Sequence, residues 1–378
     1  MKKAGYLLFA CLFHLFRIFP IKRNLIFMVA THDDSKEGNI GMTASLIKEK
    51  FPNSEIVVLT REDEKKRFSF LMQTPFMLAR AKYVFLDNAF LPLAYLHFSR
   101  KAKVVQLWHG TGTIKRFGQD VNTGGLKKLE YRANQRLTHL IVNSEYTKRQ
   151  YAQAFGVKPE IVHVLGLPRT DFFFDEEGMA RKRASFLEKY PDLAGKTIFL
   201  YAPTFRDNQV ENPEFGFEIE KIVQGMPEES VLLLRLHPHV AQNYSEDRLR
   251  DFDGMVYNMS QEEDVSTLLV SADVLITDYS SIIFEYCLLN RQIIFYAYDL
   301  KSFEQDGRSF YEPYRKYVPG PVVETEQELL NSMNDRVIDL NKLEHFRKEN
   351  FAFLDGKATE RLLSLIMENS FKSHGKYD

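Results

Sequence analysis

The chain has 378 residues, of which 44% are hydrophobic and 13% aromatic, so a disordered chain is excluded and two domains with separate cores are expected. Its 50 Lys and Arg residues balance 51 Asp and Glu residues, a balance that does not favour a nucleic-acid-binding protein. The two cysteines, Cys11 and Cys287, exclude a disulfide framework and any zinc or iron–sulfur site built on cysteines, and they suit a reducing compartment.

The first 23 residues carry five cations and no acid. The apolar run at residues 4–19 would form a helix about 24 Å long, which is shorter than the roughly 30 Å of a bilayer core. We therefore expect residues 1–23 to be a membrane-associating amphipathic segment that lies at an anionic membrane surface. A first helix buried against the protein and a cleaved export signal are the alternatives. The expected membrane contacts are Lys2, Lys3, Arg17, Lys22 and Arg23.

Strand-like runs alternate with helical stretches along residues 24–168. The predicted strands cover residues 24–30, 55–59, 83–86, 104–107, 139–143 and 162–165. The predicted helices cover residues 42–51, 69–80 and 144–155. Continuous apolar strands separated by helices are typical of a parallel sheet that is covered on both faces. This segment is therefore predicted to be an N-terminal Rossmann-like domain.

The same alternation restarts after a seam at residues 166–171 that contains glycine and proline. The predicted strands are then 197–202, 231–236, 274–276 and 293–296, and the predicted helices are 217–224, 262–271 and 281–290. Residues 169–345 are predicted to form a C-terminal Rossmann-like domain. A helical stretch at residues 340–370 follows, and its part within residues 346–378 could cross back to the first domain. The expected fold is α/β, with two doubly wound domains facing a cleft.

Polar clusters follow several of these strands, and ligands of such sheets bind beyond the carboxyl ends of the strands. The first cluster is the loop that begins at Trp108 and His109. The glycines that follow, Gly110 among them, let backbone N–H groups approach a ligand closely, while Lys115 and Arg116 add positive charge. His109 could take the proton from an attacking hydroxyl, an effect worth roughly 10²–10⁴-fold in rate. The alternative is a turn histidine that is hydrogen-bonded to the backbone.

Two further clusters follow strands of the second half. Thr204 and Arg206 offer a hydroxyl and a planar donor fork suited to phosphate oxygens, and the alternative is a solvated Arg206 paired with Asp207. His237 ends a strand and is fixed by the following proline, whereas His239 is expected at the surface. No Asp, Glu or Cys stands beside these histidines at ligand spacing, so we predict no metal site.

The strongest cluster is a strand, a polar turn and a helix start that run from Thr277 to Glu285. Ser280 and Ser281 lie where a helix presents unpaired N–H groups and a positive dipole, an arrangement that favours a phosphate. Glu285 follows Ser281 by one helical turn and could accept both hydroxyls of a ribose. The alternative is an ordinary capped helix with an acid in its first turn.

In this order, the motifs WHGTGTIKRFG, APTFRD, RLHP, TDYSSIIFE and DGKA resemble the CDP-glycerol glycerophosphotransferase family of teichoic acid synthesis. The resemblance runs from Val84 to Leu365. It implies a glycosyltransferase-B-like pair of Rossmann domains and a peripheral location on the cytoplasmic side of the cell membrane. It also implies that His109 is the base on the acceptor hydroxyl and that His237 steadies the transferring phosphate.

By the same resemblance, the N-terminal domain would hold the acceptor and the C-terminal domain CDP-glycerol. The donor-binding residues would be Thr204, Arg206, Thr277, Asp278, Ser280, Ser281 and Glu285. Within this set, Glu285 would hold the ribose, and the pyrophosphate would be held by Arg206, Thr277, Ser280 and Ser281. The acceptor loop would contain Gly110, Thr111, Lys115 and Arg116.

The implied reaction moves glycerol 3-phosphate from CDP-glycerol to a hydroxyl of a lipid-linked acceptor, releases CMP and uses no cofactor. Residues 86–90, and the lack of the long amino-terminal region of the large polymerases, resemble the primases, which act on undecaprenyl-diphosphate-linked ManNAc-GlcNAc. The WHGTGT form and the PGPVVE segment at 319–324 resemble later-acting transferases, whose acceptor is already extended with glycerol phosphate. A ribitol-phosphate transferase or polymerase of teichoic acid or capsule, a nucleotide-sugar glycosyltransferase and a non-catalytic nucleotide-binding membrane adaptor are further alternatives. Other teichoic acid enzymes are further candidate partners.

Overall fold

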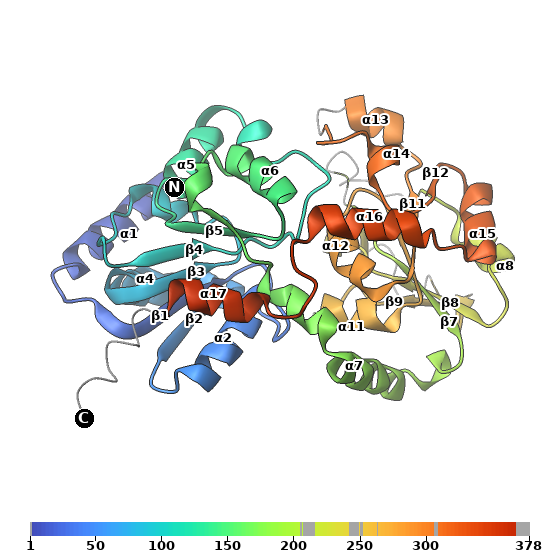
Figure 1. The fold of residues 1–378 in the computed structure, drawn as a ribbon, viewed down its shortest axis with the longest axis horizontal. Helices are drawn as coiled ribbons and strands as arrows, with labels where there is room; N and C mark the ends of the chain where they lie inside the picture. Colours follow the sequence, from blue (N-terminus) through green and yellow to red (C-terminus); the bar gives the residue numbers. More distant parts are fainter. Residues whose placement is uncertain are drawn as a thin grey trace. The chain divides into compact units, whose positions relative to one another are not determined.

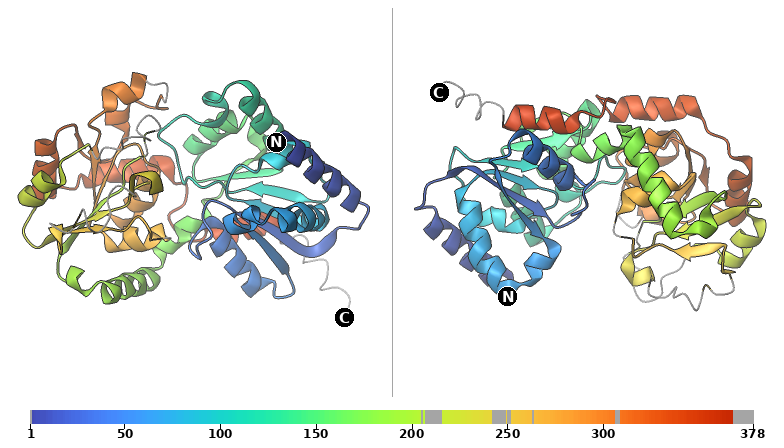
Figure 2. Two further views of the ribbon diagram at one scale, coloured as in Figure 1. Left: turned by 180° about the vertical axis from the view of Figure 1, so that it is seen from behind. Right: turned by 90° about the horizontal axis from the view of Figure 1, so that it is seen from below.

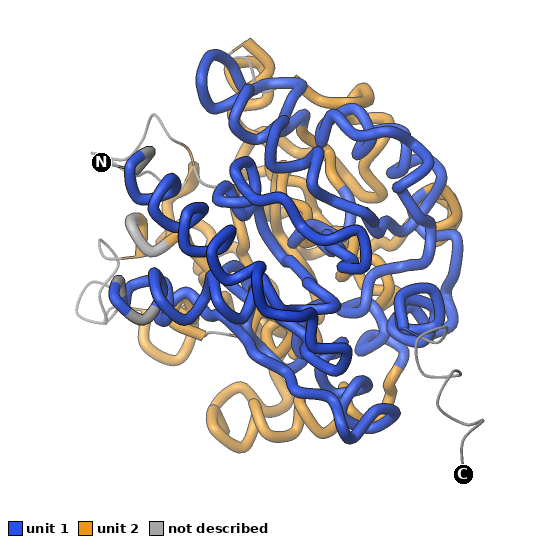
Figure 3. The backbone as a smooth tube through the Cα atoms, turned by 90° about the vertical axis from the view of Figure 1, so that its left-hand side faces the viewer, with its two compact units in different colours: residues 1–112, 116–174, 350–378 blue, residues 113–115, 175–349 orange. Residues whose placement is uncertain are grey.

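The computed structural model describes residues 2–204, 206, 216–241, 249, 252–262, 264–305 and 309–367. Two compact units make up the chain, and each has its own parallel sheet. Unit 1 contains residues 1–112, 116–174 and 350–378, and unit 2 contains residues 113–115 and 175–349 (Figure 3). The α/β class with two Rossmann-like sheets, predicted from the strand and helix pattern, is confirmed.

The sheet of unit 1 has six strands in the order β2-β1-β3-β4-β5-β6. Their bounds are β1 Lys22–Ala30, β2 Glu55–Thr60, β3 Ala81–Leu86, β4 Lys103–Gln106, β5 His139–Val142 and β6 Val162–Val164. Every pairing in this sheet is parallel, so the carboxyl ends of the six strands lie at one edge. Residues that follow these strands are therefore brought close together.

Helices cover both faces of this sheet (Figures 1 and 2). Its helices are α1 Lys2–Phe16, α2 Asn39–Lys50, α3 Arg61–Lys65, α4 Arg67–Arg80, α5 Gly124–Asn134, α6 Glu145–Phe155 and α17 Ala358–Ile366, with 3₁₀ helices η1 Leu91–Tyr95, η2 Gly118–Asp120, η3 Pro159–Ile161 and η4 Pro168–Phe174. Successive strand side chains alternate between the faces, so Phe27 packs in a cluster with α1, α4 and α6, and Met28 in a cluster with α2 and α17. This double burial explains the continuous apolar strands of the sequence.

Unit 2 has a second six-stranded sheet in the order β12-β11-β10-β7-β8-β9. Its strands are β7 Thr197–Tyr201, β8 Ser230–Leu234, β9 Val256–Asn258, β10 Val274–Thr277, β11 Gln292–Tyr296 and β12 Val322–Val323. Its helices are α7 Glu176–Lys189, α8 Ile219–Gly225, α9 Pro238–Ala241, α11 Val265–Ser271, α12 Ile282–Tyr286, α13 Leu300–Gln305, α14 Tyr314–Tyr317, α15 Glu326–Asp335 and α16 Leu340–Asn350, with 3₁₀ helices η5 Pro191–Leu193 and η8 Cys287–Leu289. Helices α8 and α15 pack together on the sheet, and α11 packs on α7 and β7.

Several elements differ from the sequence prediction. The prediction missed β9 and β12, the short strands at the two edges of the second sheet. The helical stretch expected at 340–370 is two helices, α16 and α17, separated by residues 351–357, in which Gly356 adopts a left-handed φ of +66°. Residues 368–370 lie outside the described part. The helix expected at 281–290 is α12 followed by the 3₁₀ turn η8. Unit 1 extends past the predicted seam to Phe174, since η4 packs on α2 and α17.

Helix α1 is partly embedded in unit 1. Phe9 and Phe13 are buried in the cluster that α4 and η1 also join. On the same helix Leu8 and Leu15 are half exposed, and Ile18, just after it, is 75% exposed. In the part of the chain that the structure describes, no helix has both the length and the apolar character needed to cross a membrane.

Candidate active site

His109 lies in the loop that follows β4, at the carboxyl edge of the unit 1 sheet. The side-chain oxygen of Gln106, the last residue of β4, accepts the N–H of Trp108 at 2.8 Å. The side-chain amide of Asn39, from α2, donates to the Trp108 carbonyl at 2.9 Å. Trp108 has a φ of +60°, a left-handed conformation that is strained for a bulky residue. Side chains from β4 and α2 thus hold a strained turn directly before His109.

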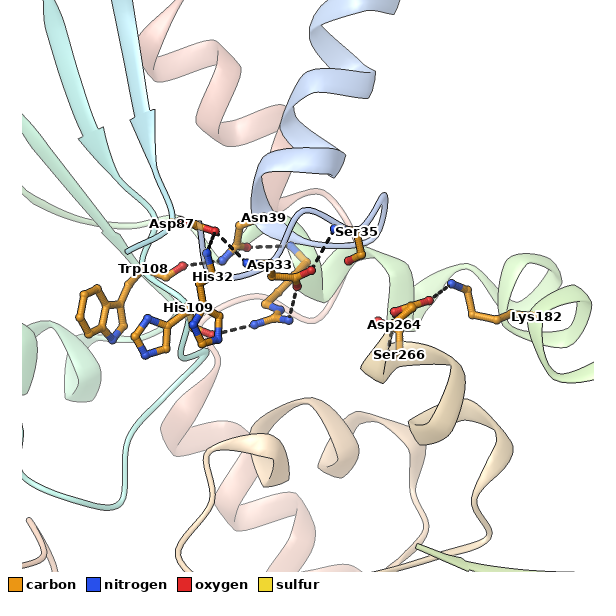
Figure 4. Close-up of polar contacts among 11 residues, drawn as sticks. His32, Asp33, Ser35, Asn39, Asp87, Trp108, His109, Lys182, Asp264 and Ser266 are labelled. Atoms are coloured by element: carbon orange, nitrogen blue, oxygen red, sulfur yellow. Dashed lines mark hydrogen bonds and ion pairs between the residues drawn. The ribbon is translucent and has the colours of Figure 1, made fainter. Parts of the chain in front are cut away.

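The carboxylate of Asp87, which follows β3, holds the neighbouring loop after β1. One carboxylate oxygen accepts the N–H of Thr31 at 3.1 Å, and the other accepts those of His32 and Asp33 at 2.9 and 3.0 Å. Asp87 is buried, and this burial raises its pKa while the three N–H bonds oppose the rise. The loop thus held places the exposed ring of His32 on His109, with the ring centroids 4.1 Å apart (Figure 4).

Arg169, from η4, ties both loops together. Its guanidinium donates to the His109 carbonyl at 2.6 Å and to the Asp33 carboxylate at 2.8 Å. Its backbone N–H donates to the side-chain oxygen of Asn39 at 3.0 Å. Because the Asp33 and Arg169 side chains are 20% and 11% exposed, water screens this ion pair only in part.

Burial and, to a smaller extent, the nearby charges of His32 and Arg169 together lower the pKa of His109 to about 3. The imidazole is therefore neutral at pH 7 and has a nitrogen that can accept a proton. Its Nδ1 is buried and has no hydrogen-bond partner within the described part of the chain. A neutral, oriented imidazole at the end of a strand is the form that general-base chemistry requires.

Two side chains donate hydrogen bonds to backbone carbonyls of the loop after His109. The Tyr151 hydroxyl donates to the Gly110 carbonyl at 2.9 Å, and the Asn143 side-chain amide donates to the Thr111 carbonyl at 2.5 Å. Thr111 is buried, with 1% of its surface exposed. The structure therefore brings Gly110 and Thr111 beside His109 as parts of a rigid support.

The two cations predicted for this loop lie in different surroundings. Lys115 belongs to unit 2, where its backbone forms an isolated antiparallel bridge with Phe310. Arg116 belongs to unit 1 and is exposed.

Arg206 lies at the centre of a buried ion-pair network in unit 2. Its guanidinium donates two hydrogen bonds to the Asp299 carboxylate, at 2.6 and 2.9 Å, and one to the Thr204 carbonyl at 2.6 Å. It also pairs with a carboxylate oxygen of Asp278 at 2.8 Å, and the ring of Tyr279 lies 5.0 Å from it. The charges of Asp278 and Asp299 raise the pKa of Arg206 against the opposing effect of its burial. The expected partner Asp207 lies outside the described residues.

Other predicted donor residues surround this network. The Thr277 hydroxyl is buried and donates to the Ala202 carbonyl at 2.6 Å. The Asp278 carboxylate accepts the backbone N–H groups of Thr204 and Tyr279 at 2.8 and 2.6 Å. The Thr204 hydroxyl is buried and has no hydrogen-bond partner among the described residues. Thr277 and Asp278 are thus occupied by the protein, and Thr204 offers a hydroxyl for a ligand.

The turn before α12 and the end of β8 carry the remaining predicted residues. Ser280 and Ser281 are both partly exposed, and the Ser280 hydroxyl accepts the Ile282 N–H at 3.4 Å. Glu285, inside α12, is buried. His237 is exposed after β8, and its carbonyl accepts the first N–H bonds of α9.

Five residues of the His109 site escaped the sequence analysis: His32, Asp33, Asn39, Asp87 and Arg169. The signal that could have found some of them is the rule already applied to His109. His32 and Asp33 come directly after the first buried strand, and Asp87 comes directly after the third. Arg169 lay in the stretch interpreted only as a seam.

Metal ligands are not gathered at either site. Within the described ranges, no three His, Cys, Asp or Glu side chains come close enough to hold a metal ion.

A chain with two Rossmann-like parallel sheets and polar clusters at their carboxyl edges has the architecture of a nucleotide-binding protein. The chain belongs to the family described as CDP-glycerol:poly(glycerophosphate) glycerophosphotransferase, whose model matches residues 11–368. The resemblance recognised from the five motifs is thereby confirmed.

Individual relatives add detail. The chain is 32% identical over 374 residues to the teichoic acid poly(ribitol-phosphate) polymerase of Bacillus spizizenii, covering 97% of this chain and 60% of that one. It is 30% identical over 332 residues to the teichoic acid glycerol-phosphate primase of Bacillus subtilis, covering 85% of this chain and 82% of the primase. A histidine-to-asparagine variant of the wall teichoic acid polymerase TagF superposes with a TM-score of 0.82 at 22% identity, over 97% of this chain and 94% of that one.

Proposed function

We propose that this protein transfers glycerol 3-phosphate from CDP-glycerol to a hydroxyl of a membrane lipid-linked acceptor in wall teichoic acid synthesis. The observation that carries the proposal is the neutral imidazole of His109, held by a strained turn at the carboxyl edge of a parallel sheet. Family membership and the similarity to a glycerol-phosphate primase support the choice of donor and acceptor. The proposed acceptor is undecaprenyl-diphosphate-linked ManNAc-GlcNAc, which makes the protein a primase.

In the proposed reaction a ring nitrogen of His109 takes the proton of the acceptor hydroxyl. The hydroxyl oxygen attacks the phosphorus next to glycerol, the bond from that phosphorus to the bridging oxygen breaks, and CMP leaves with the electron pair. The low pKa belongs to the site without substrate, since the negative phosphates of bound substrates favour the imidazolium that forms. This raises the basicity of His109 when both substrates are present.

We assign donor binding to unit 2. The partly exposed Ser280 and Ser281, with the unpartnered hydroxyl of Thr204, are the proposed contacts of the pyrophosphate. Arg206 acts as a positioning residue, because its donors are directed to Asp299, Asp278 and a backbone carbonyl. Glu285 is the proposed partner of the ribose.

For His237 we propose the steadying role on the transferring phosphate, which its exposed position after β8 allows. Lys115 and Arg116 are proposed contacts of the acceptor, because their positive charges suit its negative phosphates.

We propose a peripheral location on the cytoplasmic side of the membrane, with α1 lying at the lipid surface. The half-exposed Leu8 and Leu15 and the more exposed Ile18 supply the apolar contact. Arg17 and Arg23 are exposed beside them and can approach anionic headgroups, whereas Lys22 begins β1 and pairs with Glu55. The side chains of Lys2 and Lys3 lie outside the described part.

A second candidate is transfer of ribitol phosphate from a CDP-ribitol donor. The observation that favours it is the match to the ribitol-phosphate polymerase, which extends over 97% of this chain. The His109 chemistry is the same for both polyols, so the two candidates differ only in the pocket for the polyol.

The test is nucleotide release by the purified chain with the lipid-linked acceptor and CDP-glycerol, CDP-ribitol or UDP-sugars. The proposal expects release of CMP from CDP-glycerol. Release of UDP or UMP from a UDP-sugar would show instead that the protein transfers a sugar or a sugar phosphate. His109→Gln should slow CMP release by roughly 10²–10⁴-fold. The matched control is His139→Gln, which removes another partly buried histidine of low pKa, at the start of β5 and so at the opposite edge of the sheet. Equal rates in both variants would remove His109 from the role of base.

A further inference from the structure

An apolar cavity of about 470 Å³ opens on unit 1 between α4 and strands β1 and β2. Its walls include Phe16 at the end of α1, Phe27 of β1, and Phe70 and Phe76 of α4. The ring of Phe16 packs edge-on against that of Phe76, with centroids 5.2 Å apart. A cavity of this size and character is typical of a site for a small apolar ligand.

The mouth of the cavity continues into an apolar surface. Val58 and Met72 line the cavity and are 39% and 41% exposed. Phe19, 45% exposed, packs its ring on Phe76 with centroids 5.8 Å apart, and Phe68 on α4 is 82% exposed. Helices α1 and α4 pack side by side (Figure 2), and Phe16 at the end of α1 forms part of the cavity wall. The cavity therefore opens next to the helix proposed to lie on the membrane.

The polar residues in the lining do not make it a site for a polar ligand. They are Asp63, Gln73 and Thr74. The Asp63 carboxylate already accepts the N–H and the hydroxyl of Thr60 and a hydrogen bond from Lys66. A ligand that suits the remaining walls is a hydrocarbon chain, which gains by leaving water without needing hydrogen bonds.

The cavity also reaches the carboxyl end of β2, at the same edge of the sheet as the His109 loop. Its wall at Leu59 lies in register with Val29 of β1, and the next pair is Thr60 with Ala30. The residues that follow Ala30 are those held by Asp87, with His32 stacked on His109. A hydrocarbon chain in the cavity would therefore lie near the carboxyl edge of the sheet that carries His109.

We propose that this cavity binds the polyprenyl chain of the lipid-linked acceptor, an inference that rests on the proposed function. The position of the cavity at the carboxyl edge of the His109 sheet favours the acceptor's own chain over the chains of bulk phospholipids. The cavity would hold part of the chain and so set the position of the head group relative to His109.

The kinetic test compares Met72→Lys with Phe68→Lys. Both variants place a cation on the exposed face of α4, but Met72 lines the cavity and Phe68 does not. Acceptors with a full polyprenyl chain and with a short, water-soluble alkyl chain carry the same head group. For the polyprenyl acceptor, Met72→Lys should raise KM about tenfold, because the bound chain loses apolar contact equivalent to one to two methylene groups. Phe68→Lys should leave this KM unchanged. Turnover of the short-chain acceptor should be unchanged in both variants.

Equal effects of the two substitutions on the polyprenyl acceptor would mean that only the surface matters and would overturn the proposal. The absence of any effect of Met72→Lys would also overturn it. If the wild-type protein turned over neither acceptor, the result would contradict the proposed function and would not test the cavity. A binding measurement, which does not depend on turnover, is therefore made in parallel.

That measurement uses polyprenyl phosphate carrying a diazirine, in phosphatidylglycerol vesicles, with the labelled peptides mapped by mass spectrometry. The expected labels lie on the cavity walls at Val58, Met72 and Phe76 and are reduced severalfold in Met72→Lys. Equal labelling of these walls by a diazirine phosphatidylglycerol would show a bulk-lipid site, and labels elsewhere only would show an empty cavity; either result would overturn the proposal.

Discussion

Asp87→Asn tests how the His109 site is built. The carboxylate of Asp87 accepts three backbone N–H groups of the loop that carries His32, two on one oxygen and one on the other. An asparagine keeps a single acceptor oxygen, so at best two of the bonds survive, in weaker neutral form, and the N–H of Thr31 faces an amide NH₂ group.

The magnitude follows from these bonds. A hydrogen bond to a charged group contributes about 1.5–3 kcal/mol, and a neutral one about 0.5–1.5 kcal/mol. Losing one bond and weakening two costs about 4 kcal/mol, and relief from burying the charge of Asp87, whose pKa burial raises, returns part of this. We expect a net loss of about 2 kcal/mol in the free energy of unfolding of unit 1.

Urea unfolding followed by the fluorescence of Trp108 measures this loss, because Trp108 is the single tryptophan of the chain and lies in the loop next to His109. With a slope of about 2 kcal/mol per molar urea, the midpoint should fall by about 1 M. The control is Asp34→Asn, which removes the same charge from an exposed position of the same loop and should leave the midpoint unchanged. An unchanged midpoint and full turnover in Asp87→Asn would refute the reasoning.

Four smaller predictions follow from other contacts. Tyr151→Phe removes the hydrogen bond to the Gly110 carbonyl and should lower the unfolding free energy of unit 1 by about 1 kcal/mol, measured with urea. Arg206→Lys cannot reproduce the two-pronged carboxylate contact, so calorimetry should show weaker CDP-glycerol binding. Ile18→Asp should reduce co-sedimentation with anionic vesicles, most clearly at low salt. Stability should also fall in acid, because the unfolded chain protonates His109 below about pH 6.5 and the folded chain only near pH 3. Between these pH values the thermal unfolding temperature of the wild type should therefore fall more than that of His109→Gln.

Each of these predictions has a contrary result. An unchanged urea midpoint in Tyr151→Phe would mean that the loop does not depend on that hydroxyl. Wild-type affinity in Arg206→Lys would separate the ion-pair network from donor binding. Unaltered sedimentation of Ile18→Asp would argue against the membrane role of α1, and parallel acid profiles of wild type and His109→Gln would contradict the low pKa.

Sequence patterns predicted the sheets and the loop of His109 because both depend on neighbours along the chain. A buried strand followed by a polar turn is a local signal, and it placed the strand ends at residues 107 and 276, each within one residue of the observed ends at Gln106 and Thr277. The partners that hold those turns are distant in sequence. Arg169 reaches back to the His109 carbonyl from another part of the chain, and no local pattern contains that contact.

Arg206 illustrates the same limit in unit 2. Its motif indicated a choice between a phosphate contact and a pairing with the adjacent Asp207. Asp207 lies outside the described residues, and the guanidinium donates to Asp299, which is 93 residues away and which no spacing rule connects with it. The role of a buried arginine depends on which carboxylates surround it, and only the tertiary fold determines that.

Mass spectrometry of the lipid product tests the central claim most directly. The purified full chain is incubated with CDP-glycerol and synthetic undecaprenyl-diphosphate-linked ManNAc-GlcNAc, beside His109→Gln. The account predicts an acceptor heavier by one glycerol phosphate in wild type, with the rate reduced by roughly 10²–10⁴-fold in the variant. No mass gain from any CDP-linked polyol, or the same product at the same rate from His109→Gln, would contradict it.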